Sequence, residues 1–166
     1  CFNTVTTDLS NESSSEEEVK LAVDKAREAF GKWSRLSLEE RKQAIRSFMK
    51  ACAERKEDIA QAMSRDMGKP IKTARAQVDE SFDYFNAYFD MADEALSPEV
   101  VLENASEKHI LYREPLGVIA AITPWNFPFL NIPWQFGQAL IAGNTVVYKP
   151  SEETVLYAKL IAEIIE

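Results

Sequence analysis

Two stretches in the second half of the chain decide its fold: residues 118–128, VIAAITPWNFP, and residues 143–152, GNTVVYKPSE. Each contains a continuous apolar run that ends in polar residues and proline. Continuous rather than alternating hydrophobicity is typical of a strand covered on both faces, as in a parallel sheet. Helical apolar patterns over residues 129–142 and 154–165 follow the two runs. The pattern predicts a β-α-β-α unit whose strands pair in parallel through right-handed crossovers.

The first half of the chain predicts helices. Residues 15–18, SEEE, and residues 37–40, SLEE, both have the capping-box pattern, in which a serine and the third following glutamate satisfy free backbone N–H groups. The apolar periodicity predicts one helix from each box, the second running as far as the stop signal at Gly68. A third helix is expected from Pro70 to Ser97.

Changes in pattern divide the chain into four units of an α/β protein. Residues 1–14 are polar and rich in Ser, Thr and Asn, and we interpret them as an extended or loosely ordered arm. Residues 15–98 hold the helices. Residues 99–113 hold two short apolar runs on either side of a polar turn, which predicts a β-hairpin. Residues 114–166 hold the β-α-β-α unit.

Composition excludes several classes of function. Of the 166 residues, 46% are hydrophobic and 28% are charged, which is typical of a globular domain and not of a disordered chain. The formal net charge of −8 argues against nucleic-acid binding, which needs a basic surface. It leaves room for an anionic cofactor, because backbone N–H groups and one lysine can bind an anion locally. No apolar run is long enough to cross a membrane.

Cysteine usage and the N-terminus favour the cytoplasm. The two cysteines, Cys1 and Cys52, could form one disulfide, but the count gives no disulfide framework and favours a reducing compartment. No basic segment followed by an apolar core marks a signal peptide.

The chain is expected to be a piece of a larger α/β domain. Two parallel strands do not make a stable sheet alone. The last helix reaches Glu166 without a stop signal, and the first residue is Cys1 rather than Met, so we expect further sequence on both sides.

Asn126 is a candidate catalytic residue. It lies between Trp125 and Phe127, and Pro124 and Pro128 stiffen the loop on either side. A fixed side-chain amide is the donor that an oxyanion hole needs. The alternative is an Asn that caps the next helix, and the local sequence favours this commoner arrangement.

Lys149 and Glu152 are candidate cofactor ligands. They follow the second apolar strand, at the carboxyl edge where an open parallel sheet binds nucleotides. A lysine and a carboxylate there can hydrogen-bond two adjacent hydroxyls, as on a ribose. Alternatively, Lys149 is a surface lysine, and Glu152 and Glu153 are acids that stabilise a helix start. Spacing alone does not separate the two interpretations.

Other residues are expected to be structural. There is no glycine fingerprint, no Walker A loop and no metal-ligand spacing. His109 lies in the expected hairpin, and Cys52 lies on the apolar face of a helix, where a buried core thiol is the commoner arrangement. Trp125 and Trp134 are expected to pack against the core or loops.

Three segments carry a resemblance to a known family: residues 114–119, EPLGVI; residues 122–128, ITPWNFP; and residues 139–152, ALIAGNTVVYKPSE. Their order and spacing resemble the NAD(P)-dependent aldehyde dehydrogenase superfamily. Residues 38–41, LEER, and residues 67–70, MGKP, are also similar. The resemblance covers nearly the whole chain and is weakest at its start.

The resemblance implies a truncated aldehyde dehydrogenase fold, in which N-terminal helices lead into the first half of a Rossmann-like cofactor sheet and the hairpin serves oligomerisation. It implies that Asn126 donates its amide to the substrate oxyanion and that Lys149 and Glu152 bind the adenosine ribose. It also implies a cofactor-binding set completed by Thr123, Pro124, Trp125 and Ser151, and the lack of metal-ligand spacing predicts no metal site.

The reaction implied by the resemblance oxidises a small-molecule aldehyde to a carboxylic acid. A thiolate forms a thiohemiacetal, hydride passes to the nicotinamide, and water hydrolyses the thioester with a glutamate as base. The catalytic cysteine, the glutamate and the glycine-containing cofactor turn lie downstream in the family, so the segment itself is expected to be inactive. We expect NAD, with NADP as the alternative, because Glu152 would repel a 2′-phosphate. The full-length protein is expected to be a homo-oligomer, a dimer or a tetramer.

The sequence leaves two other hypotheses about function open. One is a non-catalytic short form that acts as an assembly or binding module through the hairpin. The other is a sibling reaction on the same fold, such as CoA-acylating or phosphorylating dehydrogenation. The sequence does not indicate which aldehyde is the substrate.

Overall fold

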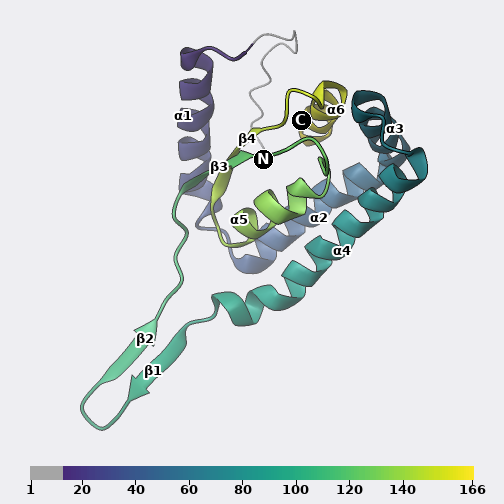
Figure 1. Cartoon of the computed structure of the whole chain (residues 1–166). Helices are drawn as coiled ribbons and strands as arrows, with labels where there is room; N and C mark the ends of the chain where they lie inside the picture. The colour runs from purple at the N-terminus through teal and green to yellow at the C-terminus, as the bar shows by residue number, and fades with distance from the viewer. Residues whose placement is uncertain (1–12) are drawn as a thin grey trace.

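The structure of the protein is a computed structural model, of which residues 13–166 are described. A group of helices encloses most of the core, a pair of parallel strands lies beside it, and a hairpin extends away from both (Figure 1). In chain order the elements are α1 (Glu16–Trp33), α2 (Leu38–Glu54), α3 (Lys56–Met67), α4 (Ile71–Leu96), β1 (Glu99–Glu103), β2 (Lys108–Leu111), β3 (Val118–Ile122), the π-helix η1 (Ile132–Gly137), α5 (Gln138–Ile141), β4 (Thr145–Lys149) and α6 (Val155–Ile165). Most of the expected arm, residues 1–14, lies outside the described residues, and so does Cys1, the other half of the one disulfide that the cysteine count would allow.

The predicted helix starts are confirmed. Ser15 and Ser37 each form a complete capping box at the start of α1 and α2. Gly68 ends α3 in the left-handed conformation, with φ of 70°, and its N–H bonds to the carbonyl of Ser64. A side chain at Gly68 would make this backbone conformation costly, so the glycine is what allows the sharp end of α3.

The expected single helix from residue 38 to Gly68 is wrong, because the structure breaks it at Arg55. Arg55 has φ of −108° and ψ of 17°, outside the helical region, and separates α2 from α3. The break lets α3 run along α4, where Lys56 pairs with Asp79 at 2.5 Å and Glu57 pairs with Arg75 at 2.8 Å. No glycine or proline marks the position, so tertiary packing decides it.

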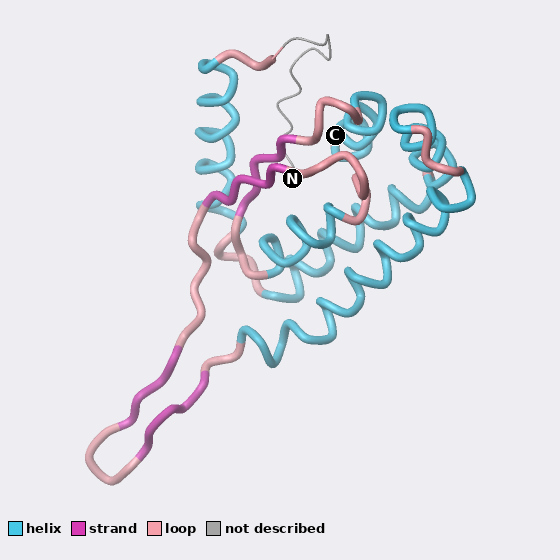
Figure 2. The backbone as a smooth tube through the Cα atoms, in the orientation of Figure 1, coloured by secondary structure: helices cyan, strands magenta, loops and turns pink. Residues whose placement is uncertain are grey.

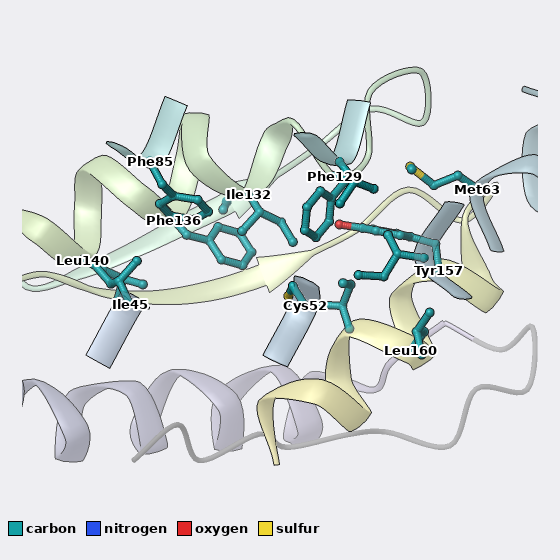
Figure 3. Packing of buried hydrophobic residues seen from close by; sticks show 14 of the residues in the cluster. Ile45, Cys52, Met63, Phe85, Phe129, Ile132, Phe136, Leu140, Tyr157 and Leu160 are labelled. Carbon is teal, nitrogen blue, oxygen red and sulfur yellow. The ribbon is translucent and has the colours of Figure 1, made fainter. Parts of the chain in front are cut away.

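The core lies between α2, α3, α4 and the elements that follow β3. Figure 3 shows buried side chains from both halves of the chain in contact across it, with Tyr157 reaching toward Phe129. The two rings meet edge-on, with centroids 6.4 Å apart. Cys52 is fully buried in the same cluster, which confirms its expected place in the core.

The parallel pair of β3 and β4 is confirmed, in a register that places Val118 beside Thr145 and Ile122 beside Lys149. One face packs on the core, where Tyr148 meets Phe136 of η1 with ring centroids 4.6 Å apart. The other face meets α1, where the Thr145 hydroxyl donates to the carbonyl of Ala26 at 2.9 Å.

The strand pair of β3 and β4 is not fully buried on both faces within residues 13–166. Ala121 is fully buried, but Ile122 is 71% exposed. The segment 129–142 is also not the single α-helix that was expected. It forms the π-helix η1 followed by the short α-helix α5. Pro133, near the start of η1, lacks the N–H of a regular α-helical turn.

The hairpin of β1 and β2 extends from the body as a separate arm (Figure 2). All of its strand residues are exposed. Its turn is built by the Asn104 side chain, which accepts hydrogen bonds from the N–H groups of Ser106 and Glu107 at 2.9 and 3.1 Å. Arg113 bonds Glu99 at 3.1 Å across the base. No helix within the described residues is long and apolar enough to cross a membrane.

Candidate active site

The carboxyl ends of β3 and β4 lie together, as the sequence predicted. The N–H of Thr123 donates to the carbonyl of Lys149 at 3.2 Å, which extends the strand pairing by one step. Thr123 is 5% exposed, and its hydroxyl donates to the hydroxyl of Tyr148 at 3.3 Å. Thr123 therefore lies under the edge of the sheet and anchors the loop that follows.

The loop after β3 is held largely by its backbone carbonyls. Asn131 donates its side-chain amide to the carbonyl of Pro124 at 3.4 Å and its N–H to that of Phe127 at 3.0 Å. The hydroxyl of Tyr157, at the start of α6, donates to the carbonyl of Pro128 at 3.0 Å. Because these donors come from two different parts of the chain, the loop is fixed by tertiary structure as well as by its prolines.

Asn126 is exposed at the centre of this loop. Its side-chain amide makes no hydrogen bond within residues 13–166, and its carbonyl accepts one from the Lys69 ammonium at 2.7 Å. The helix-cap interpretation that local sequence favoured is wrong, since η1 begins six residues later and has no side-chain cap bond. The amide of Asn126 thus points to no structural partner. Its role as an oxyanion donor stays a prediction.

Lys149 and Glu152 form a pair at the edge of β4. The Lys149 ammonium lies 3.0 Å from the Glu152 carboxylate, and the side chains are 61% and 78% exposed. A hydrogen bond from its own backbone N–H, followed by the hydrogen bond and charge of Lys149, lowers the pKa of Glu152. An ammonium donor and a charged acceptor therefore face solvent side by side, which is an arrangement that fits two neighbouring hydroxyls. The helix-start interpretation is weakened, because α6 has no acidic residue in its first turn.

Ser151 turns inward from the same edge. It is 8% exposed, and its hydroxyl accepts a hydrogen bond from the N–H of Glu153 at 3.3 Å. Its carbonyl accepts from the hydroxyl of Thr154 at 3.0 Å. Ser151 thus shapes the turn between β4 and α6, and its predicted contact with a cofactor remains untested.

Trp125 and Pro124 are exposed on the solvent side of the loop. Trp125 is 51% exposed, so its expected packing role is only partly met. Trp125 lines a hollow of about 320 Å³ together with Asp66, Met67 and Glu153. This hollow brings the end of α3, the Asn126 loop and the start of α6 to one place.

Sequence reasoning missed the residues that support the site from a distance. Asp66 accepts hydrogen bonds from the N–H groups of Leu156 and Tyr157 at 3.2 and 2.9 Å, and so caps α6. Tyr157 is fully buried beneath the loop and Tyr148 is half-buried there, and desolvation raises the pKa of both hydroxyls. An apolar helix or strand pattern marks such tyrosines as core residues, but no local signal shows which loop their hydroxyls bond.

The remaining candidates lie away from this edge. Cys52 is buried, and desolvation raises the pKa of its thiol to about 12, so it is a neutral thiol near pH 7. His109 is in the hairpin beside Glu107, at 3.2 Å. No group of three or more His, Cys, Asp or Glu residues in the described part of the chain could hold a metal ion.

Comparison with known proteins adds to this geometry. The sequence model described as "Aldehyde dehydrogenase family" matches residues 4–166. The mitochondrial succinate-semialdehyde dehydrogenase of Arabidopsis thaliana is 37% identical over 144 residues, which cover 86% of this chain and 27% of that protein. The NADP(+) succinate-semialdehyde dehydrogenase GabD of Escherichia coli K12 is 31% identical over 148 residues, which cover 89% of this chain and 31% of that protein.

The solved structures agree with these relatives. The crystal structure of PnpE, from Pseudomonas sp. WBC-3, in complex with nicotinamide adenine dinucleotide is similar with a TM-score of 0.82 at 37% identity. The match covers 90% of this chain and 31% of that one. The chain therefore spans less than a third of the length of these three proteins.

Proposed function

Because the chain belongs to the aldehyde dehydrogenase family, we propose that it supplies the oxyanion donor and part of the cofactor edge of an NAD(P)-dependent aldehyde dehydrogenase. The observation that carries the proposal is the side-chain amide of Asn126. It is exposed and has no hydrogen bond within residues 13–166, while its loop is fixed from several sides. A donor that has no structural partner and is carried by a fixed backbone suits a charge that develops only during reaction.

The chain's own part in the reaction is to stabilise negative charge on the aldehyde oxygen. When a thiolate adds to the aldehyde carbon, the carbonyl oxygen becomes an oxyanion, and the Asn126 amide donates to it. The nucleophile is not Cys52, because its thiol is fully buried and has a pKa near 12. The nucleophilic cysteine is therefore expected outside residues 13–166, and the family resemblance implies the same for the general base.

The cofactor edge fits the ribose of a dinucleotide. Lys149 offers an ammonium donor and Glu152 a charged acceptor, 3.0 Å apart and open to solvent. A bound nicotinamide would supply the acceptor for the hydride that leaves the substrate. NAD is the preferred cofactor, because the Glu152 carboxylate would repel the 2′-phosphate of NADP. The comparisons include an NADP(+) enzyme and an NAD complex, so both cofactors belong in the test.

The kinetic test uses the full-length protein that contains this chain, with succinate semialdehyde as first substrate because two relatives are named for it. We expect Asn126→Ala to lower kcat by about 10²–10³-fold, the usual effect of removing one oxyanion donor. The affinity for NAD should change little. Asn86→Ala, an exposed asparagine on α4, is the matched control. An Asn126→Ala enzyme with the wild-type kcat would contradict the proposed role.

Two further measurements address the cofactor edge and the chain alone. Lys149→Ala should weaken NAD binding, and Glu152→Gln should raise the affinity for NADP relative to NAD; Lys159→Ala, an exposed lysine on α6, is the control. The 166-residue chain by itself should give no NADH from aldehyde and NAD. Thiol-dependent turnover by this chain would overturn the expected location of the nucleophile.

We also propose that the hairpin of β1 and β2 is an assembly surface of a homo-oligomer. Val100, Leu102, Ile110 and Leu111 are 37–48% exposed in a two-stranded arm that no other element covers within residues 13–166. Such an arm is marginal alone and gains stability when a partner covers it. We expect Ile110→Asp to lower the oligomer mass in sedimentation, whereas Ala105→Asp in the turn should not. Equal masses for both variants would contradict this role.

The same surface would serve the alternative of a non-catalytic assembly module. That alternative predicts assembly by the 166-residue chain without any effect on turnover. The cytoplasmic location stays a prediction, since one of the relatives is named as mitochondrial.

A further inference from the structure

Lys69 occupies a fixed position at the end of α3. Gly68 turns the chain in the left-handed conformation just before it, and Pro70 follows it at the start of α4. The side chain is half-buried, and burial lowers the pKa of its ammonium. Pro70 restricts the backbone of Lys69 to extended conformations, because a residue before a proline is disfavoured in the helical region.

The ammonium of Lys69 acts on the Asn126 loop and on nothing else in the described residues. Its Nζ donates to the carbonyl of Asn126 at 2.7 Å and lies 4.7 Å from the centre of the Phe127 ring, as a cation–π contact. No carboxylate forms an ion pair with Lys69 within residues 13–166, although acidic residues outnumber basic ones in the chain. A partly desolvated charge directed at one loop is unusual for a surface lysine.

The hydrogen bond from Lys69 restrains the backbone of Asn126, whose side-chain amide is the proposed oxyanion donor. Asn131 and Tyr157 hold the carbonyls of the neighbouring loop residues, but at Asn126 itself Lys69 supplies the one hydrogen bond seen in the described chain. Fixing the carbonyl of Asn126 restricts the backbone rotation that swings its side chain. A misplacement of about 1 Å at a reacting group can lower the rate by about 10²-fold.

We propose that Lys69 is a positioning residue, which holds the side-chain amide of Asn126 in place for the oxyanion through the Asn126 carbonyl. The proposal rests on the proposed role of Asn126. The end of α3 then supports two parts of the site, because Asp66, three residues before Lys69, caps α6. One turn of chain thereby ties the oxyanion loop to the helix that follows the cofactor edge.

The test is a double-mutant cycle in the full-length protein that contains this chain. Lys69→Met should lower kcat by about 10–100-fold with little change in the KM for NAD, and Lys69→Arg should restore most of the rate, since a guanidinium can donate to the same carbonyl. Lys72→Met, an exposed lysine on α4, is the control. Since Lys69 acts through Asn126, Lys69→Met/Asn126→Ala should be no slower than Asn126→Ala.

The outcomes separate this proposal from the proposed function. If Asn126→Ala is as active as wild type, the role of Asn126 fails. If Asn126→Ala is slow but Lys69→Met is not, or the two losses multiply in the double variant, only the role of Lys69 fails. A spectroscopic readout on the same full-length protein gives a second test that does not depend on turnover. Lys69→Met should shift the Phe127 amide and the Asn126 side-chain signals in nitrogen-15 spectra, and unchanged signals would overturn the proposal.

Discussion

Removal of the Asp66 carboxylate is expected to loosen the start of α6. Thr154, which precedes the helix, makes no side-chain cap bond. Asp66 instead accepts from Leu156 N–H at 3.2 Å and from Tyr157 N–H at 2.9 Å. These are the second and third residues of the helix, the positions that an N-cap side chain normally serves. Asp66 is therefore a helix cap supplied from a distant part of the chain.

The two hydrogen bonds set the size of the expected loss. The N–H of Leu156 is exposed, so water can replace Asp66 there, whereas the N–H of Tyr157 is partly buried. Loss of a cap costs about 0.5–2 kcal/mol, and with the second bond unreplaced we expect Asp66→Ala to lower the free energy of unfolding by about 1–2 kcal/mol. Asp66→Asn keeps an acceptor oxygen and loses only the charge, at a cost of about 0.3–1 kcal/mol.

Thermal melting and amide exchange give the readout. For a chain of this size, 1 kcal/mol moves Tm by about 2–4 °C, so Asp66→Ala should melt about 2–8 °C below wild type. The amide of Tyr157 should also exchange faster with solvent in this variant. Asp90→Ala is the matched control, since Asp90 is exposed on α4 and makes no bond within the described residues. If the two variants melt together and the Tyr157 amide stays protected, the capping role of Asp66 is refuted.

Three other substitutions probe the packing and charge around the same framework. Tyr157→Phe removes the buried donor to the Pro128 carbonyl and should lower the free energy of unfolding in urea by about 1–3 kcal/mol; an unchanged value would mean that water replaces the hydroxyl. Gly137→Ala places a Cβ 3.0 Å from a ring carbon of α4 and should cost about 1–3 kcal/mol, and a neutral effect would show that the ring moves aside. Glu57 has a pKa lowered from 4.5 to about 2, chiefly by the hydrogen bond from Arg75, so its stabilisation is present above pH 4.5 and is lost as pH falls toward 2. Glu57→Gln should therefore lower Tm at pH 7, by a margin that shrinks below pH 4.5, and a constant margin would contradict this linkage.

The sequence was sufficient where local chemistry decides the structure. The capping boxes at Ser15 and Ser37 and the stop at Gly68 depend on residues within one turn of each other, and all three are present. The parallel pairing of β3 and β4 follows from the position of their apolar runs. These features are readable because each depends on a short stretch of chain with one favourable conformation.

Long-range packing decided what the sequence did not show. The break at Arg55 carries no glycine or proline signal, and it exists because α3 must turn to meet α4 and α6. The π-helical turn of η1 is a compromise around Pro133 that an apolar pattern cannot distinguish from an α-helix. At Asn126, helix-cap statistics pointed the wrong way, because the nearest helix starts too far along the chain for its side chain to reach.

The way the Asn126 loop is held explains why its side chain is free. Pro124 and Pro128 have no N–H, so the loop offers its surroundings carbonyl acceptors more than donors. Lys69 supplies one of the donors, at 2.7 Å, and Tyr157 another, at 3.0 Å. Because the backbone is fixed through its carbonyls by other elements, no loop side chain is needed for that purpose. The site should therefore order only when α3 and α6 have docked, so variants at Asp66 that loosen α6 should also broaden the Asn126 side-chain signals. Sharp Asn126 signals in an Asp66→Ala chain whose α6 amides exchange quickly would show that the loop orders by its prolines alone.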